Sequence, residues 1–355
     1  MHSRFWAAVI FTACAAASTV VGQVVPTHAN VHYGDGGVRQ VLDIYLPVGP
    51  VPAGGRPVVV WIHGGGWQNG DKASAAGRAA QLMPLGFAVV GINYRLSGTD
   101  SHPAQINDCK GAIRWLRSHA AEYGLDDLRF GVWGSSAGGH LVALVGTSGD
   151  AEGIEGTVGG NEGKSSRVQA VVDYFGPADM MAITTIGHLS CASPESAMLG
   201  VCLGDVVANQ NDPAWADDVA LVNSASPRFY VSADDPPFHI AHGTSDPVVE
   251  MNQSVLLHGS LSAAGVVATL RLIPGDGHGL PQGEDTHSRR FLACQLSTTY
   301  CEGDWDANGI RNVPDMFAYL NNWFAGDLAA DQDGSGVLGV PDIFEFLSAW
   351  FAPCG

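Results

Sequence analysis

The stretch FGVWGSSAGGH, residues 130–140, decides the fold that this chain is expected to adopt. Its first four residues favour a buried strand, and a helix-favouring run begins after Ser136. A sharp turn between strand and helix crowds the backbone, so small residues are needed on both sides of the serine, at Gly134 and Gly138. The stretch therefore predicts a strand–turn–helix unit that presents the hydroxyl of Ser136 above a sheet.

Strand-like and helix-like segments alternate on both sides of this unit. Five further runs favour strands: 58–62, 88–93, 168–174, 238–242 and 267–273. The alternation predicts the α/β class, with a mostly parallel sheet and helices on both faces. After 88–93, apolar residues recur at steps of three and four from Ile106 to Ala120, which predicts a crossover helix with Pro103 at its first position.

Two stretches interrupt this rhythm, 149–166 and 182–227. Both are rich in Gly, Ser, Asn and Asp and have weak periodicity. We expect them to be insertions over the edge of the sheet that carries the site.

A second glycine motif, HGGGW at 63–67, follows the predicted strand 58–62. Glycine at this place lets backbone N–H groups approach an oxyanion that develops during acyl transfer. We expect the N–H groups of Gly65 and Gly66 to form the oxyanion hole together with that of Ala137. His63 is expected to brace the loop, and the alternative is a glycine loop that only turns the chain.

A serine that acts as a nucleophile needs a histidine and an acid to form a catalytic triad. These two residues are expected after late strands, because open α/β sheets present their sites at the carboxyl ends of the strands. Asp246 follows the predicted strand 238–242, and His278 follows 267–273. In this arrangement His278 takes the proton from Ser136, while Asp246 orients the imidazole.

Five other residues compete for the histidine and acid roles: His140, His242, Asp234, Asp235 and Asp276. The two histidines lie in a predicted helix and at a strand end, which favours packing or hydrogen-bonding roles. The paired aspartates precede two prolines and are expected to end a loop. The last aspartate is close in sequence to His278 and cannot easily reach round to it.

Several segments together resemble a known family: HGGGW at 63–67, residues 108–116, GSSAGGH at 134–140, DYFGPAD at 173–179, DDPPF at 234–238 and HGTSDP at 242–247. Over residues 30–295 the chain resembles secreted esterases that include bacterial feruloyl-esterase-like enzymes, and more distantly hormone-sensitive-lipase-like esterases. The resemblance implies an α/β-hydrolase fold and hydrolysis of carboxylic esters, with feruloyl or acetyl groups on plant polysaccharides as expected substrates. The triad and oxyanion positions of that family fall on the residues named above.

The C-terminal segment repeats itself, because residues 304–324 align with 331–351 and ten of the 21 aligned positions are identical. Each copy begins with oxygen-bearing side chains at the spacing of a calcium loop and continues as a short amphipathic helix. The expected ligands are Asp304, Asp306, Asn308, Ile310 and Asp315 in the first loop and Asp331, Asp333, Ser335, Val337 and Asp342 in the second. Ile310 and Val337 would contribute backbone carbonyls.

This repeat resembles a dockerin domain, which implies two structural Ca²⁺ ions and a cohesin-like receptor on a scaffold or cell surface. The apolar residues of the two helices, including Val313, Phe317, Val340 and Phe344, are expected to pack face to face. The alternative is an acidic turn repeat without metal. A module of this size needs extra constraints, which the ions and a bridge between Cys301 and Cys354 would supply.

Residues 1–22 have the layout of a secretory signal peptide, with a basic start, an apolar stretch and small residues near its end. The apolar stretch is too short to span a membrane, although a membrane anchor is the alternative. The expected organisation is therefore a signal peptide at 1–22, an esterase domain at 23–298 and the calcium-binding module at 299–355. The expected location is extracellular, with attachment to a cell surface as an option.

Export permits disulfides, and six cysteines remain after the signal segment: Cys109, Cys191, Cys202, Cys294, Cys301 and Cys354. Fifteen connectivities are open. Nearness in the chain favours Cys191 with Cys202 and Cys301 with Cys354, which leaves Cys109 with Cys294.

A formal charge of −18 excludes nucleic acid as a partner, since no basic stripe is present to neutralise phosphates. Carboxylic-ester hydrolysis is the predicted activity, and no cofactor is expected for it. The alternatives are a peptidase or lactonase of the same fold, or a scaffold or adhesion protein with a degenerate hydrolase domain.

Overall fold

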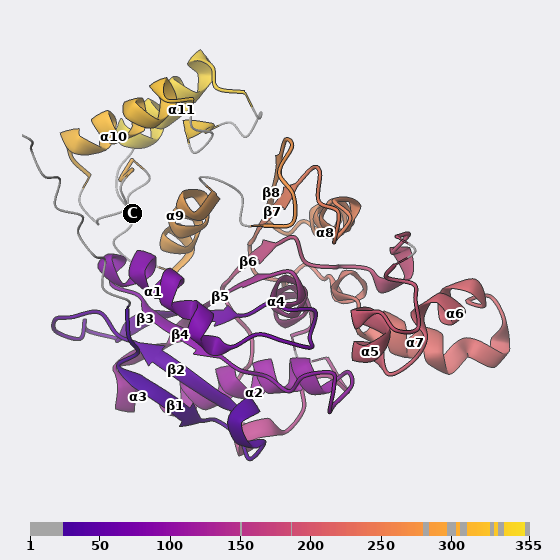
Figure 1. Cartoon of the computed structure of the whole chain (residues 1–355). Coiled ribbons are helices and arrows are strands. Elements are labelled where there is room, and N and C mark those ends of the chain that lie inside the picture. The colour runs from indigo at the N-terminus through magenta and orange to yellow at the C-terminus, as the bar shows by residue number, and fades with distance from the viewer. Residues whose placement is uncertain are drawn as a thin grey trace, which may run out of the picture.

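The computed structural model of the chain describes residues 24–149, 151–185, 187–279, 284–296, 303–305, 311–326, 330–332 and 337–351. Within these residues the chain folds around an eight-stranded sheet of order β1-β2-β4-β3-β5-β6-β7-β8 (Figure 1). The strands are β1 (His28–His32), β2 (Val41–Tyr45), β3 (Arg56–Ile62), β4 (Ala88–Ile92), β5 (Leu125–Ser135), β6 (Ala170–Tyr174), β7 (Phe238–Gly243) and β8 (Ala268–Ile273). β2 is antiparallel to both of its neighbours, whereas β3 to β8 run parallel.

The six predicted strands are confirmed as β3 to β8, but β1 and β2 at the antiparallel edge were not predicted. β1 is mostly exposed and contains little that favours a strand. In β2 a run of apolar residues is interrupted by Asp43, which is buried and forms an ion pair with Lys72 at 2.8 Å.

The sheet separates two hydrophobic cores, and β3 shows how its residues are divided between them. Val58, Val60 and Ile62 face one core, whereas Val59 and Trp61 face the other. Successive side chains of a strand point to opposite faces, so a run that is apolar at every position indicates a strand covered on both sides.

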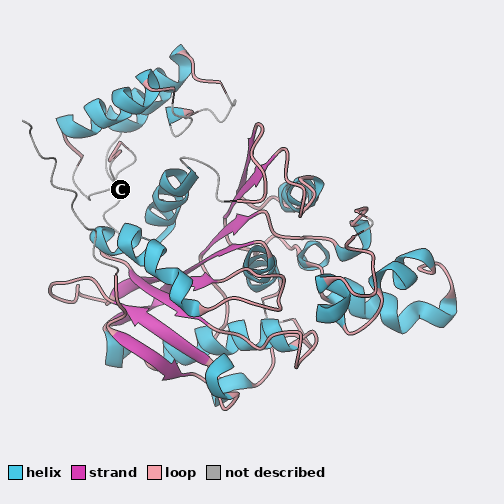
Figure 2. Ribbon diagram, viewed as in Figure 1, coloured by secondary structure: helices cyan, strands magenta, loops and turns pink. Residues whose placement is uncertain are grey.

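Helices cover both faces of the sheet (Figure 2). The first core contains residues of α2 (Ala104–Ser118), α4 (Ala137–Thr147) and α8 (Asn252–Ala263), with α3 (Ala120–Tyr123) following α2. The second core contains residues of α1 (Ala76–Leu82) and α9 (Glu284–Leu296). The predicted crossover helix is thus confirmed as α2, except that Pro103 caps it and the helix begins at Ala104.

Short 3₁₀ helices complete the connections: η1 (Gly37–Arg39), η2 (Lys72–Ala75), η3 (Met83–Leu85), η4 (Val158–Gly160), η5 (Met180–Ala182), η6 (Pro213–Trp215) and η7 (Pro227–Tyr230). No helix in the described part of the chain has the length and apolar character needed to cross a membrane.

The two predicted insertions lie in different places. Residues 182–227 contain α5 (Pro194–Leu199), α6 (Leu203–Ala208) and α7 (Ala216–Ser224), and they border the site described below. Residues 149–166 instead lie against α2, where Glu155 accepts hydrogen bonds from Lys110 and Arg114. The expectation that this stretch covers the site was therefore wrong, because buried cations of α2 hold it elsewhere.

One of the three expected disulfides is confirmed, between Cys191 and Cys202. The pairing of Cys109 with Cys294 was wrong, since Cys109 is a free thiol buried in α2 while Cys294 is exposed on α9. Pairing by elimination failed because the apolar face of α2 encloses Cys109. Residues 1–22, Cys301 and Cys354 lie outside the described residues, so the signal peptide and the third disulfide stay predictions.

The C-terminal repeat forms two helices, α10 (Val313–Phe324) and α11 (Val340–Phe351). Their shared interior contains Trp305, Tyr319, Ala330 and Phe346, with Tyr319 stacked on Phe346 at a ring distance of 4.1 Å. Leu320 and Leu347, which were expected to pack face to face, do pack against this interior. The other residues of that prediction are exposed: Val313, Phe317, Phe324, Val340, Phe344 and Phe351. The prediction was wrong for these six because each helix carries a second apolar stripe, and this other stripe is the buried one.

Residues that precede the two helices also contact arginines of α9 and β8. The guanidinium of Arg290 lies 4.0 Å from the ring centre of Trp305, and Arg271 lies 3.8 Å from a carboxylate oxygen of Asp331. The C-terminal segment is thus in contact with the sheet domain as well as linked to it by the chain.

The buried and exposed stripes of α11 can be distinguished by substitution. Phe346 is 1% exposed and Phe344 is 64% exposed. Phe346→Ala removes a core ring and is expected to cost about 3–5 kcal/mol in the stability of the helix pair. Phe344→Ala is expected to cost far less. Hydrogen exchange of peptides from 311–326 and 337–351 in the whole protein measures both, and equal protection in the two variants would contradict the assignment of the stripes.

Candidate active site

Ser136 lies at the turn between β5 and α4 in a backbone conformation that few residues adopt, with φ +57° and ψ −123°. Its N–H donates to the carbonyl of Tyr174 at 2.8 Å, which fixes the turn against β6. A Cβ atom at Gly138 would overlap the carbonyl oxygen of Ile62, and one at Gly134 would overlap that of Gly138. The turn is therefore close-packed, as the sequence predicts, and it holds the strained serine in place.

The structure brings Ser136, His278 and Asp246 together. Nε2 of His278 is 3.0 Å from Oγ of Ser136, and Nδ1 of His278 is 2.7 Å from Oδ2 of Asp246. The three side chains thus form one hydrogen-bonded chain, although they come from three separate loops. A serine, a base and an orienting acid at these distances are the arrangement that activates a serine hydroxyl.

Asp246 is shielded from solvent and is held by several donors. Its Oδ1 accepts the N–H groups of Val248 at 2.7 Å and Val249 at 3.0 Å, and its Oδ2 lies 3.3 Å from Nε2 of His242. Burial disfavours ionisation, but the hydrogen bonds from the two histidines and the two amides outweigh it and lower the pKa of Asp246. The carboxylate therefore stays ionised beside the imidazole of His278.

The glycine loop lies beside this triad of side chains. Gly65 and Gly66 both have positive φ, at 111° and 59°, which explains why glycine occupies both positions. Within the described residues, the N–H groups of these two glycines donate no hydrogen bond. Ala137 is at the first position of α4, where an N–H has no partner inside the helix. All three expected oxyanion residues line the same pocket as Ser136 and His278.

Two histidines brace this loop. His140 donates from Nε2 to the carbonyl of Ala225 at 2.6 Å and accepts at Nδ1 from the indole of Trp67 at 3.2 Å, which ties the loop to α4. Burial lowers the pKa of His140 to about 3 and that of His63 to about 4, so both are neutral. His63 stacks on Tyr94 at a ring distance of 4.4 Å.

The competing residues lie in other surroundings. His242 is bonded to Ser254 and to the carbonyl of Val249, so it supports the loop of Asp246. Asp234 pairs with Arg167 at 2.9 Å, and Asp235 accepts from Ser232. Among the described residues, His278 has hydrogen bonds to Ser136 and Asp246 and none to these two aspartates or to Asp276.

A pocket of about 450 Å³ opens above the serine. Besides the predicted residues, it is lined by Phe175, Pro177, His188, Pro194, Glu195, Val248 and Val249. Sequence reasoning did not single these residues out. The ring of Phe175 lies 4.7 Å from that of His278. The backbone of Phe175 has a positive φ of 43°, a strained conformation that no sequence motif signals.

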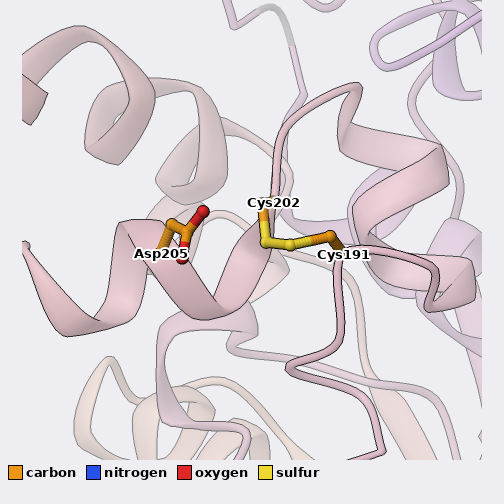
Figure 3. A group of neighbouring side chains, drawn as sticks. All are labelled: Cys191, Cys202 and Asp205. Atoms are coloured by element: carbon orange, nitrogen blue, oxygen red, sulfur yellow. A yellow bond between two sulfur atoms is a disulfide. The ribbon is translucent and has the colours of Figure 1, made fainter.

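A group of three side chains lies within the insertion 182–227, which borders the pocket: Cys191, Cys202 and Asp205 (Figure 3). Figure 3 shows the two sulfur atoms joined to each other, with Asp205 beside them. Thiolates bind metal ions, whereas the sulfurs of a disulfide are already bonded, so this group is a structural crosslink.

Comparison with known proteins agrees with this geometry. The sequence pattern of the family described as BD-FAE matches residues 42–261, which is more than half of the chain and includes β2 to β7, Ser136 and Asp246. The chain belongs to the BD-FAE family. The match ends before His278, which the structure nevertheless places beside Ser136, as the sequence predicts.

Several relatives of this BD-FAE chain are esterases by name. It is 33% identical over 238 residues to the esterase LipQ of Mycobacterium tuberculosis, which is 67% of this chain and 53% of that protein. It is 33% identical to a truncated carbohydrate esterase from gut microbiota, with a TM-score of 0.68 and coverage of 78% of this chain and 99% of the other. An esterase of Thermogutta terrifontis is 26% identical, with a TM-score of 0.57 and coverage of 74% and 88%.

These relatives establish an α/β-hydrolase fold for the BD-FAE domain. The chain spans about half the length of the curated relatives that it matches first.

The close packing of the serine turn can be tested with two glycines in helices. A Cβ at Gly138 would overlap the carbonyl of Ile62, whereas Gly259 in α8 has open space around it. Gly138→Ala is therefore expected to lower the melting temperature and displace Ser136. Gly259→Ala is expected to be neutral or to stabilise by about 0.5–1 kcal/mol, since alanine favours a helix. The melting temperatures of both variants, measured by thermal unfolding, test this prediction. A Gly138→Ala variant with the melting temperature of the parent would show that the turn tolerates a side chain.

Proposed function

We propose that the chain is a secreted serine carboxylic-ester hydrolase that removes feruloyl or acetyl groups from plant-type polysaccharides. The observation that carries the proposal is the hydrogen-bonded chain from Ser136 through His278 to Asp246, which ends in an open pocket. The similarity to a carbohydrate esterase from gut microbiota supports a substrate linked to carbohydrate.

In the proposed reaction, Nε2 of His278 takes the proton of the Ser136 hydroxyl as Oγ attacks the carbonyl carbon of the ester. The tetrahedral intermediate then collapses, and the leaving alcohol receives that proton from His278. Water, activated by the same nitrogen, attacks the acyl-enzyme and releases the acid. Asp246 holds the imidazole and stabilises its charged form.

The amides of Gly65, Gly66 and Ala137 would bind the oxyanion. Loss of one such donor typically costs about 3–4 kcal/mol of barrier. Their position at the pocket wall, without partners among the described residues, supports this role. A peptidase or lactonase of the same fold would use the same groups, but esterases among the relatives favour ester substrates.

Substitution of the serine tests the reaction directly. Ser136→Ala is expected to reduce hydrolysis of 4-nitrophenyl acetate to background, because it removes the nucleophile and leaves the fold intact. Ser135→Ala is the matched control and is expected to keep most of the activity. Labelling by a fluorophosphonate is expected for the parent and the Ser135 variant only. Substantial turnover by purified Ser136→Ala would refute the assignment, and an inactive parent would favour a scaffold or adhesion role.

We also propose that residues 299–355 are a dockerin-like module with two structural Ca²⁺ ions. Five expected ligands are described, and four of them, Asp304, Asp315, Asp331 and Asp342, are each at most 2% exposed. These four carboxylates lie at the first and twelfth positions of the two repeat copies, and carboxylate oxygens at this spacing are donors that a hard ion such as Ca²⁺ prefers. Val337 is described and exposed, whereas Asp306, Asn308, Ile310, Asp333 and Ser335 lie outside the described residues.

The bound ions would neutralise these carboxylates and stabilise the helix pair. The exposed apolar stripe of α10 and α11 supports an attachment role, because monomeric proteins seldom leave such residues together in water. The proposed partner is a cohesin-like receptor on a scaffold or cell surface. The Cys191–Cys202 disulfide supports export, since such bonds form in oxidising compartments.

Removal of calcium tests the module in the whole protein. With EGTA, peptides from 311–326 and 337–351 are expected to exchange hydrogen faster, since the buried carboxylates then repel one another. The rate on 4-nitrophenyl acetate is expected to stay unchanged, because the contacts at Arg271 and Arg290 are not in the pocket lining. Added Ca²⁺ is the control and restores protection. Unchanged exchange would contradict calcium binding, and loss of rate would contradict the independence of the two parts.

A further inference from the structure

The pocket above Ser136 continues into a smaller cavity behind it. The two spaces share the side chains of Pro177, His188, Glu195, Val248 and Val249. The smaller cavity has a volume of about 10 Å³, which is room for about one water-sized group. Its wall is mostly apolar and has polar side chains at His188, Glu195, Glu250 and Gln253. The carboxylate of Glu250 already accepts hydrogen bonds from Thr184 and Thr185, so the unpaired atoms of the other residues determine what the cavity can bind.

Glu195 contributes an unpaired acceptor to this wall. The residue is 3% exposed, and its Oε1 is 2.8 Å from Nδ1 of His188. Its Oε2 is buried and has no hydrogen-bond partner among the described residues. A buried carboxylate oxygen without a donor is costly, and because Glu195 lines the cavity, a group that enters the cavity can supply the donor.

Gln253 contributes an unpaired donor to the same cavity. The residue is 1% exposed, and its Oε1 accepts the N–H groups of Ala178 at 2.9 Å and Asp179 at 2.8 Å. Because two main-chain donors require the oxygen on that side, the orientation of the amide is fixed. Its Nε2 is buried without a partner among the described residues.

An acceptor and a donor in one small space match a group that can both donate and accept. A hydroxyl does so with a single oxygen. An ammonium group would leave the amide of Gln253 unpaired, and a carboxylate or phosphate would be repelled by Glu195. The chemistry of the cavity therefore selects a neutral hydroxyl.

We propose that Glu195 and Gln253 form a subsite that binds a hydroxyl group of the ester substrate while Ser136 attacks its carbonyl. The subsite rests on the proposed ester hydrolysis and makes it selective. The hydroxyl comes either from a phenol on the acyl group or from the sugar on the alcohol side, because both have the same hydrogen-bonding capacity.

The local structure holds Glu195 in place for this task. The Cys191–Cys202 disulfide closes the segment that contains it, and Ser193 caps α5 by accepting the N–H of Ser196 at 3.1 Å. The preceding Pro194 lies against Gly66 of the oxyanion loop. The position of the carboxylate is thus fixed relative to the place where the carbonyl reacts.

Matched substrate pairs test the subsite in the unmodified whole protein. The first pair is methyl ferulate and methyl 3,4-dimethoxycinnamate, which differ in the phenolic hydroxyl. The second is an acetylated xylo-oligosaccharide and its O-methylated counterpart. The protein is expected to prefer the hydroxyl-bearing member of one pair by about tenfold or more in kcat/KM. Preference in the first pair places the hydroxyl on the acyl group, and preference in the second places it on the sugar.

Variants then assign the preference to the two residues. Glu195→Gln replaces the charged acceptor, and Gln253→Glu keeps the bonds to Ala178 and Asp179 but removes the donor. Both are expected to abolish the preference, which is measured as the ratio of kcat/KM for the two members of a pair, so that a change common to both members cancels. Glu152→Gln, an exposed site, is the matched control and is expected to keep the preference.

Equal rates of the parent protein within both pairs would overturn the subsite and assign the cavity to water. This outcome does not depend on whether the variants fold. A preference that survives in folded variants would also overturn it. A parent protein that hydrolyses none of these esters, including 4-nitrophenyl acetate, would instead refute the proposed function itself.

Discussion

The structure depends on one steric constraint, the contact between the backbone of α4 and the end of β3. At Gly138 the backbone of α4 comes so close to the backbone of β3 that no Cβ fits between them. This contact forces the turn at Ser136 into a strained conformation and directs its hydroxyl away from the sheet. It also brings the glycine loop after β3 next to the first amides of α4. Ser136 and the N–H groups of Gly65, Gly66 and Ala137 are thus neighbours because these two backbone segments touch.

The sequence predicts this part of the molecule well because steric and periodic rules act locally. The glycines around Ser136, the apolar runs of β3 to β8 and the apolar face of α2 each carry their own signal. Asp246 and His278 were located because parallel strands present their ends at the same edge of a sheet. Distances between them could not be derived, since they depend on the registers of β7 and β8.

Other features were missed for a different physical reason, which is that they depend on contacts between distant segments. β2 is a strand because β4 pairs with it, although its own residues include a buried Asp43. Each of α10 and α11 has two apolar stripes, and composition does not say which one meets the partner helix. Cys109 was assigned to a disulfide although packing encloses it. Glu195 has no motif around it and is recognisable only from its burial and its unpaired oxygen.

The bond between Cys191 and Cys202 links the chemistry of the pocket to the redox state of the surroundings. None of the three side chains at the reacting centre lies in the segment that this bond closes, so they can assemble in a reducing compartment. The wall that contains Glu195 would be held there by weaker contacts alone, and the unfolded chain would be less restricted. Under the proposed function, a molecule in a reducing compartment would therefore hydrolyse esters with less selectivity. Formation of the disulfide would complete the shape of its pocket.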